Sequence, residues 1–152
     1  EFLTLTSGSG LLYHSFDKYG PIVQGLHTGR RNGALISIGQ GKAVPYALFN
    51  LQDRGKMIVE AGVEIYEGMI IGINSRNNDL VVNPLKGKQL TNIRSSGTDE
   101  AVTLTTPINV TLEFALEFIN NDELVEVTPI SLRVRKRYLK EHERKKAARA
   151  AS

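Results

Sequence analysis

Short apolar runs separated by glycine and asparagine turns constrain the fold of this chain more than any other feature. Three consecutive runs occupy residues 57–59, 63–66 and 69–73. Gly62 and Gly68 lie in the turns between them. Runs this short do not make amphipathic helices, and their spacing is typical of an antiparallel meander or a small barrel. The sequence therefore predicts an α+β fold built on a strand-rich mixed or antiparallel sheet, or on a small barrel.

Further strands are predicted on both sides of this meander. Each is an apolar or β-branched run that is bounded by Gly, Pro, Asn or Asp, the residues that favour turns. These strands are predicted at residues 11–16, 34–38, 80–83, 101–105, 124–127 and 130–134.

Two short helices are predicted from apolar residues at helical spacing. Residues 45–53 form the first, with Pro45 at the first helical position, where its missing N–H costs nothing. Thr111 caps the second, because its hydroxyl can accept a hydrogen bond from the first turn. The apolar side chains expected to face the core are Ala47, Leu48 and Leu51 in the first helix and Leu112, Ala115, Leu116 and Ile119 in the second.

The composition limits the chemistry that is available to the chain. With 152 residues, of which 41% are apolar and 23% charged, the chain can form a compact domain with its own core. Cysteine is absent, which excludes disulfides and thiolate metal sites, and the three histidines lie far apart in the sequence. No apolar run approaches the roughly 18 residues that span a bilayer. We expect a monomeric, cytoplasmic protein with no membrane partner, metal or bound cofactor.

Positive charge is concentrated at the C-terminus. The whole chain carries a net charge of +3. Residues 133–152 contain nine Lys or Arg and two Glu, so the rest of the chain is acidic. A charged helix or a frayed tail is predicted at 138–151, inside a basic tail that spans 136–152. Such a tail favours RNA or another polyanion as a partner, and a solvated helix end is the alternative.

The segment 84–100 has neither helical nor strand periodicity and is rich in Gly, Ser, Thr and Asn. A long aperiodic loop inside a compact domain is usually functional or disordered. Its cations are Lys86, Lys88 and Arg94, and residues 84–98 contain no Asp or Glu. Cations and free N–H groups suit contacts with RNA phosphates, whereas a solvated loop is the alternative reading.

Other candidate residues carry less information. The stretch 39–42, Gly-Gln-Gly-Lys, precedes a predicted helix, but a phosphate loop requires Ser or Thr after the lysine, and Ala43 follows here. GTP binding is therefore not expected. We expect this stretch instead to present its lysine and the backbone amides of the helix N-terminus to an RNA phosphate. The weaker RNA-binding candidates are Lys42, Arg54, Arg76, Arg137 and Lys140.

No combination of residues in the sequence indicates catalysis, so we expect no catalytic residue and no enzymatic activity in this chain. Two other classes of function stay open. A small hydrolase would need a pocket in which titratable groups converge. A protein-interaction module without direct RNA contact would show an exposed apolar patch.

Four long motifs resemble the C-terminal domain of the TypA/BipA family of ribosome-associated translational GTPases. The motifs are residues 43–55, 63–80, 87–101 and 111–129, in the order of that family. The likeness runs from about residue 2 to 138. It implies three parts: a remnant of a fold like domain V of elongation factor G at 1–20, the family's C-terminal domain at 21–135, and the basic tail at 136–152.

The resemblance also implies a function. The whole factor would be GTP-driven, would bind the ribosome in the manner of elongation factor G, and would act in ribosome assembly and the stress response. GTP and Mg²⁺ would bind in a GTPase domain that this chain does not contain. The C-terminal domain would contact large-subunit rRNA and the acceptor arm of the A-site tRNA, with the 84–100 loop approaching the peptidyl transferase centre. Pro45 departs from the family's pattern.

Overall fold

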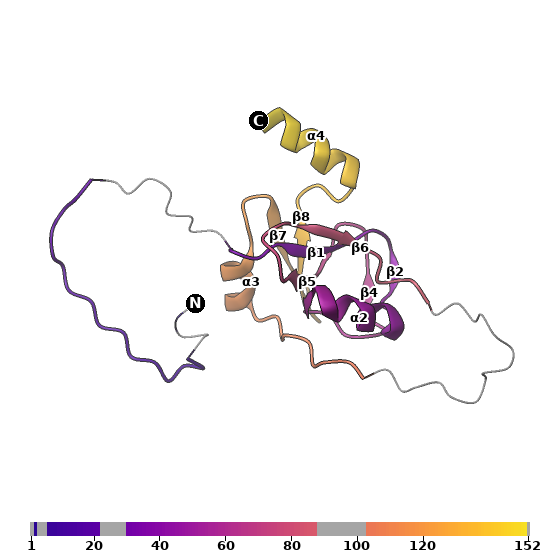
Figure 1. Ribbon diagram of the computed structural model, residues 1–152, viewed down its shortest axis with the longest axis horizontal. Helices are drawn as coiled ribbons and strands as arrows, with labels where there is room; N and C mark the ends of the chain where they lie inside the picture. The colour runs from indigo at the N-terminus through magenta and orange to yellow at the C-terminus, as the bar shows by residue number, and fades with distance from the viewer. Residues whose placement is uncertain (1, 3–5, 22–29, 88–102, 152) are drawn as a thin grey trace, which may run out of the picture.

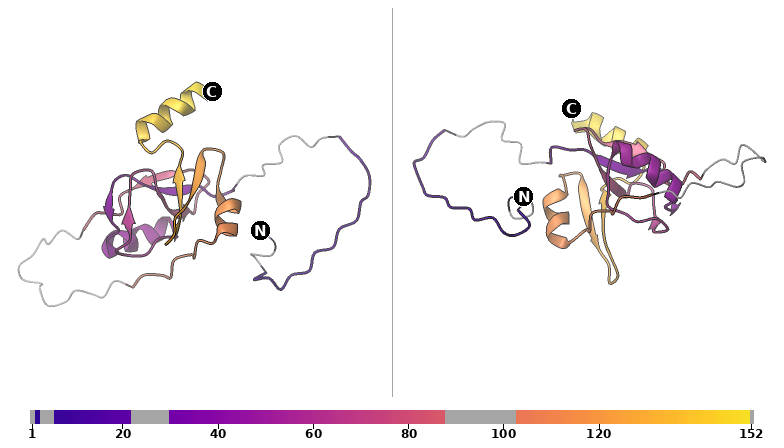
Figure 2. Two further views of the ribbon diagram at one scale, coloured as in Figure 1. Left: turned by 180° about the vertical axis from the view of Figure 1, so that it is seen from behind. Right: turned by 60° about the horizontal axis from the view of Figure 1, so that its bottom comes forward.

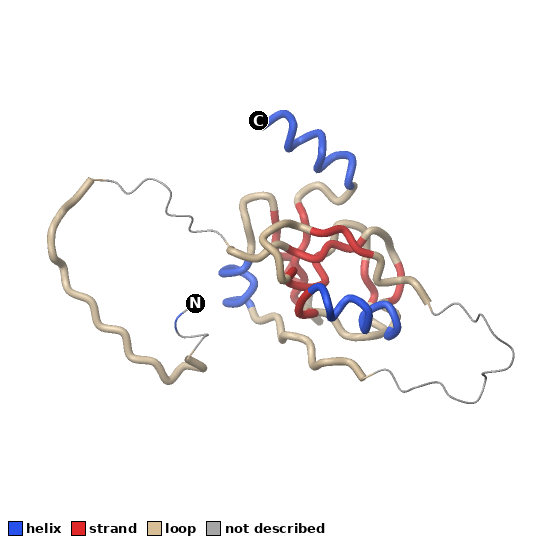
Figure 3. The backbone as a smooth tube through the Cα atoms, in the orientation of Figure 1, coloured by secondary structure: helices blue, strands red, loops and turns tan. Residues whose placement is uncertain are grey.

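The computed structural model describes residue 2 and residues 6–21, 30–87 and 103–151 (Figure 1). Its helices are α2 (Pro45–Leu51), the 3₁₀-helix η1 (Gln52–Arg54), α3 (Leu112–Phe118) and α4 (Glu141–Ala151). Its strands are β1 (Ala34–Ser37), β2 (Gly41–Lys42), β3 (Gly55–Met57), β4 (Glu64–Ile65), β5 (Ile70–Asn74), β6 (Leu80–Val82), β7 (Glu123–Val127) and β8 (Leu132–Lys136). Figure 3 shows how these elements are distributed along the backbone.

A four-stranded sheet in the order β3-β5-β1-β6 forms the centre of the domain. β5 runs antiparallel to β1 and β3, whereas β6 runs parallel to β1, so the sheet is mixed. The pairs β2–β4 and β7–β8 are separate two-stranded sheets. The predicted α+β fold is confirmed, with an open mixed sheet in place of the small barrel that the strand spacing also allowed.

Each face of this sheet carries a hydrophobic core, because successive strand residues point to opposite faces. Leu35 and Ile71 belong to the first core, where Leu48 of α2 packs with them. Ile36 and Ile70 belong to the second core. In the second core the partners are Ala115 and Phe118 of α3 and Val134 of β8. The domain therefore has three layers: α2, the sheet, and α3 with the β7–β8 hairpin (Figure 2).

The helices begin and end where the sequence indicated, but α3 packs differently. Pro45 stands at the start of α2, and Thr111 accepts a hydrogen bond from the amide of Phe114 at 3.2 Å. The predicted stripe was wrong for Leu112 and Leu116, which are 45% and 60% exposed. Phe118 is buried instead.

The aromatic side chains of α3 explain why the buried face of this helix differs from the predicted one. The rings of Phe114 and Phe118 stack at a centroid distance of 5.4 Å. The guanidinium of Arg30 lies 4.0 Å from the centroid of the Phe118 ring. A helix of two turns buries only one narrow stripe of side chains. Aromatic rings occupy this stripe because they bury more apolar area than leucine does.

Two predicted strands do not form in the described residues. Leu12, Tyr13 and Phe16 are 71%, 86% and 73% exposed, and residues 11–16 pair with no other strand that the structure describes. A single strand leaves its backbone groups without partners, so an apolar run alone is insufficient. Residues 103–105 are likewise outside any strand, and 101–102 lie outside the described residues.

The predicted charged helix is confirmed as α4, which extends away from the sheet (Figure 1). None of the helices in the described part of the chain is both long enough and apolar enough to cross a membrane.

Candidate nucleic-acid interface

The topology places Lys42 and Lys86 at one end of the central sheet, and Arg54 and Arg76 at the other. β1 and β6 run parallel, and β5 runs against them. One end of the sheet therefore holds residues 30–33, 52–54 and 75–79, and the other holds 38–44 and 83–87. In Figure 1, residues 30–33 enter on the left of the domain and residues 84–87 leave on the right.

Lys42 and Lys86 share the second of these ends, which we call the lysine end. Lys42 lies in β2 and Lys86 follows β6, and both are exposed. The amide of Val44 donates to the carbonyl oxygen of Pro84 at 2.9 Å, which ties the two segments together. Lys88 and Arg94, together with most of the 84–100 loop, lie outside the described residues. The two lysines thus mark the base of that loop.

The resemblance of residues 39–42 to a phosphate loop does not extend to their geometry. Lys42 is a strand residue, and the amide of Ala43 donates to Val63 at 2.9 Å. The amide of Val44 is occupied as well. The amides of Ala43 and Val44 are therefore used by the fold, and the contact of Lys42 and the amides of the helix N-terminus with an RNA phosphate stays a prediction.

Arg54 and Arg76 meet at the other end of the sheet. The amide of Ser75 donates to the carbonyl oxygen of Arg54 at 2.8 Å, and the amide of Gly33 donates to that of Arg76 at 2.7 Å. Both arginine side chains are exposed. Two residues that are 22 positions apart in the sequence therefore share one surface.

The tail presents less free charge than its sequence suggested. Three of the nine cations in residues 133–152 belong to β8, and one of these, Lys136, is only 2% exposed. Arg144 donates to the carbonyl oxygens of Tyr138, at 3.1 Å, and of Leu139. Lys145 pairs with Glu141 at 2.5 Å. Arg137 and Lys140 are exposed, as an RNA-facing role requires.

A buried ion cluster, which the sequence did not predict, lies beside α3. Its members are Arg30, Asp79, Asp122, Glu123 and Lys136. Glu123 is its centre: its side chain is fully buried, and its two oxygens accept from both nitrogens of the Arg30 fork at 2.9 Å. Lys136 lies 2.8 Å from Glu123, 2.8 Å from Asp122 and 2.5 Å from Asp79.

The cluster changes the titration of two of its members. Burial alone would raise the pKa of Asp79, but the hydrogen bonds from Lys136 and from the amide of Ala34 hold this pKa below its usual range. Burial alone would lower the pKa of Lys136, but its hydrogen bonds to Asp122, Asp79 and Glu123 raise it. Both groups therefore stay charged at neutral pH. The cluster fixes Arg30 and Lys136 inside the fold and removes both from the set of RNA-facing cations.

The stability of the domain should depend on Asp79 in a pH-dependent way. Because the folded pKa is depressed, the ionised carboxylate stabilises the fold above its unfolded pKa of about 3.9, and this contribution is lost as the pH falls through the folded pKa. Asp79→Asn should thus lower the urea midpoint at pH 7, and the deficit should shrink toward pH 3. A deficit that is equal at pH 7, 5 and 3 would contradict this assignment.

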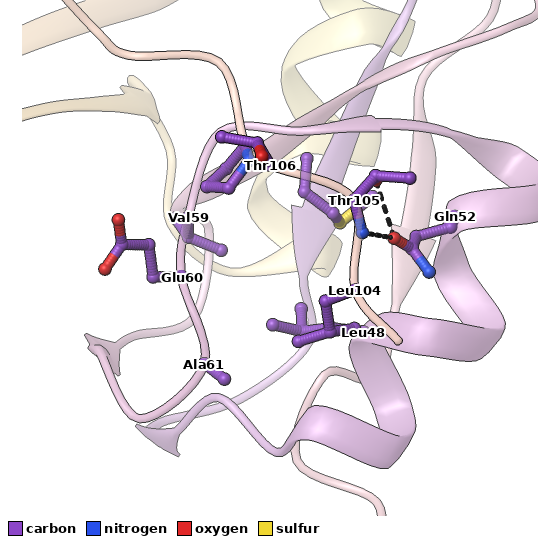
Figure 4. A pocket seen from close by; sticks show the side chains of 10 residues that line it. Leu48, Gln52, Val59, Glu60, Ala61, Leu104, Thr105 and Thr106 are labelled. Atoms are coloured by element: carbon purple, nitrogen blue, oxygen red, sulfur yellow. Dashed lines mark hydrogen bonds between the residues drawn. The ribbon is translucent and has the colours of Figure 1, made fainter. Parts of the chain in front are cut away.

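A small pocket between α2 and residues 104–107 offers no catalytic arrangement. Its volume is about 200 Å³. Gln52 crosses its mouth and accepts hydrogen bonds from the amide and the hydroxyl of Thr105 at 2.5 and 2.6 Å (Figure 4). Glu60 is the one ionisable lining residue, and its carboxylate points away from Gln52. A hydrolase needs converging titratable groups, and this pocket does not bring them together.

A larger groove of about 710 Å³ lies between residues 106–110 and the tip of the β7–β8 hairpin. Its lining is mainly apolar, and its charged lining residues are Glu60 and Arg133. At the hairpin tip, Val127 and Ile130 are 71% and 97% exposed. Such a surface is the kind of feature that a protein-interaction module would show. In the described part of the chain no group of acidic, His or Cys side chains could hold a metal ion.

Comparison with known proteins shows which family this chain resembles. Residues 32–141 match the family model of the TypA/BipA C-terminal domain. The chain is 63% identical over 150 residues, or 99% of its length, to the large ribosomal subunit assembly factor BipA of Escherichia coli strain K12. The proteins of that name from Salmonella typhimurium and Haemophilus influenzae are 62% and 57% identical, over 98% and 100% of the chain. The chain spans about a quarter of the length of these relatives.

Proposed function

This chain belongs to the TypA/BipA family, whose C-terminal domain it carries, and from this premise we propose that it is a non-catalytic RNA-binding module that holds its factor on the large ribosomal subunit. The whole factor would assemble large subunits, in line with the name of its relatives, and would hydrolyse GTP with Mg²⁺ in a domain outside this chain. Its place of action would be the cytoplasm, where ribosomes are built.

The observation that carries this proposal is the position of Lys42 and Lys86. The fold brings both lysines, exposed, to the base of the 84–100 loop, whose sequence adds Lys88 and Arg94. The loop therefore begins beside two exposed lysines. Phosphate contacts need cations and donors at a defined position more than they need a shaped pocket.

We assign the finer contacts to the same loop. The 84–100 segment would contact large-subunit rRNA and the acceptor arm of the A-site tRNA. Arg137, Lys140 and the exposed cations of α4 would make additional, more diffuse contacts, because long side chains on an extended helix lose much conformational entropy when they are fixed. A role in the stress response would follow from subunit assembly under adverse conditions.

The alternative is a protein-interaction module without direct RNA contact. Ile130, at 97% exposure beside the apolar groove, is the observation that favours it. The two functions differ in their response to salt. Counterion release makes RNA binding steeply salt-dependent, whereas burial of apolar surface is insensitive to moderate salt or strengthened by it.

Sedimentation of the chain with isolated large and small ribosomal subunits, at about 50 mM and about 200 mM salt, tests the proposal. We expect the chain to pellet with large subunits at the lower salt and to be released, at least tenfold, at the higher salt. Salt-independent pelleting that Ile130→Asp abolishes would establish the alternative. The absence of binding to the large subunit at both salt concentrations would refute the proposal.

A further inference from the structure

Three chain segments meet in very close contact at the end of the sheet opposite the lysine end. Gly33 and Gly55 make this possible. A Cβ atom on Gly33 would lie 2.0 Å from the carbonyl oxygen of Asn78, and one on Gly55 would lie 1.8 Å from that of Ile73. Since real Cβ atoms do not approach so closely, only glycine lets the backbones of 31–33, 53–55 and 73–78 pack together here. Each of these segments brings one exposed arginine to the surface.

The arginines are Arg31, Arg54 and Arg76, and we call their surface the arginine corner. Arg76 sits at the apex of a turn that is held from within. The buried side chain of Asn74 accepts from the amide of Arg76 at 3.3 Å and donates to the carbonyl oxygen of Asn78 at 2.6 Å. The position of the corner is therefore fixed by the β-sheet and not by a freely moving loop.

The chemistry of the corner differs from that of the lysine end. All three of its cations are arginines, and in the described part of the chain none of their guanidinium groups forms an ion pair with an acid. Asp53 is the one acid in the segments 31–33, 53–55 and 73–78, with Lys56 and Asp79 directly after the last two of them, and Asn77 and Asn78 add neutral donors. By contrast, Arg30 forms an ion pair with Glu123 in the buried ion cluster.

The corner also lacks what a protein partner would need. None of the exposed large apolar side chains of the described residues falls in these three segments. Protein interfaces depend on buried aromatic or aliphatic anchors, whereas contacts with a nucleic-acid backbone are made by arginine, asparagine and backbone donors. A planar guanidinium also binds a phosphate through two parallel hydrogen bonds, which an ammonium group cannot do.

We propose that the arginine corner is a second RNA-binding site, which grips the phosphodiester backbone of a segment of RNA other than the one that the lysine end contacts. The proposal rests on the RNA-binding function proposed above. With a site at each end of the sheet, the domain links two RNA segments. Such a bridge suits an RNA that is still being folded.

Hydroxyl-radical footprinting of large-subunit RNA with the bound chain tests this site. The variants are Arg54→Ala/Arg76→Ala, the charge-preserving Arg54→Lys/Arg76→Lys, and Lys42→Ala/Lys86→Ala for the other end of the sheet. Lys146→Ala/Arg149→Ala is the matched control, because it removes two exposed charges of α4. Unchanged urea midpoints show that each variant is folded, and all chains are compared at saturating concentration.

The wild-type chain should protect two separate RNA stretches. Arg54→Ala/Arg76→Ala should lose one stretch and keep the other, with at least a tenfold loss of affinity, and Lys42→Ala/Lys86→Ala should lose the reciprocal stretch. The lysine substitutions should keep most of the salt dependence but not the protected stretch, since the paired hydrogen bonds are gone.

Several outcomes would overturn the second site. Two intact stretches in Arg54→Ala/Arg76→Ala, or the same loss in the α4 control, would leave the corner as ordinary positive surface. Cross-linking of the corner to a ribosomal protein in place of RNA would also reject it. In each of these cases the wild-type footprint persists, so RNA binding itself stands. A wild-type chain with no footprint would instead reject the RNA-binding function.

Discussion

Glu123→Gln is expected to lower the free energy of unfolding by about 3–5 kcal/mol, since removing one partner of a buried ion pair leaves the others uncompensated. The side chain of Glu123 is fully buried. It forms ion pairs with Arg30 and Lys136 and accepts a hydrogen bond from the amide of Asn120. Glutamine keeps the volume, so no cavity contributes to the loss. Domains of this size have total stabilities of only about 5–15 kcal/mol. The variant should therefore be partly unfolded in modest urea.

Lys145→Ala is the matched control for this prediction. It also removes a short ion pair, with Glu141 at 2.5 Å, but the side chains of that pair are 68% and 41% exposed. Exposed pairs contribute about 0–1 kcal/mol, so the urea midpoint should barely move. Equal midpoints for Glu123→Gln and Lys145→Ala would show that the buried cluster does not hold α3 and the hairpin to the sheet.

The elements that could be predicted from the sequence are those with a local signal. Gly62 and Gly68 separate the strands, Pro45 starts α2 and Thr111 caps α3, and each of these effects acts within a few residues. The buried side of α3 was not predictable in this way. It depends on Arg30, which stacks on Phe118 from 88 residues away.

The ion cluster was invisible for the same reason. In the sequence, Lys136 is one of several cations in a basic tail, and no residue near it indicates that Asp79 is its partner. An acid such as Glu123 at the start of an apolar run was the available signal, because buried charges are nearly always paired. Glu123 and Lys136 come together through the pairing of β7 with β8, and the bridge between Arg135 and Met69 brings this hairpin to the sheet that carries Asp79.

The exposure of the candidate cations could be predicted from the sequence, but their grouping into surfaces could not. Lys42, Lys86, Arg54 and Arg76 are exposed, as an RNA-facing role requires, yet their division between two ends of the sheet follows from strand order alone. Arg31 was not among the predicted candidates, and only the hydrogen bond from Gly33 to Arg76 brings its segment to the 74–78 turn. Strand order in a mixed sheet depends on long-range contacts that periodicity does not encode.

The second large effect is expected when the loop cations are removed together. Lys86→Ala/Lys88→Ala/Arg94→Ala should weaken binding to the large subunit on the order of a hundredfold near 0.1 M salt, because each lost phosphate contact removes nearly one released counterion. A loop that is anchored at Lys42 and Lys86 can hold its cations close to folded RNA. Cations on α4 must be ordered first, at an entropic cost.

The matched variant removes three exposed tail cations, Lys140→Ala/Lys146→Ala/Arg149→Ala, and leaves the partnered Arg144 and Lys145 in place. It changes the net charge by the same amount as the loop variant. We expect it to flatten the salt dependence but to cost much less affinity, because its contacts are diffuse. When the same substitutions are made in the whole factor, we expect growth complementation to be lost for the loop variant and kept for the tail variant.

Binding curves of the wild-type chain, the loop variant and the tail variant with large ribosomal subunits, across one salt series, test the central claim most directly. The claim is that this domain recognises RNA through positioned loop cations. It predicts a steep salt dependence for the wild type and a far larger loss of affinity for the loop variant than for the tail variant. Equal losses for the two variants, together with full complementation by both, would contradict it.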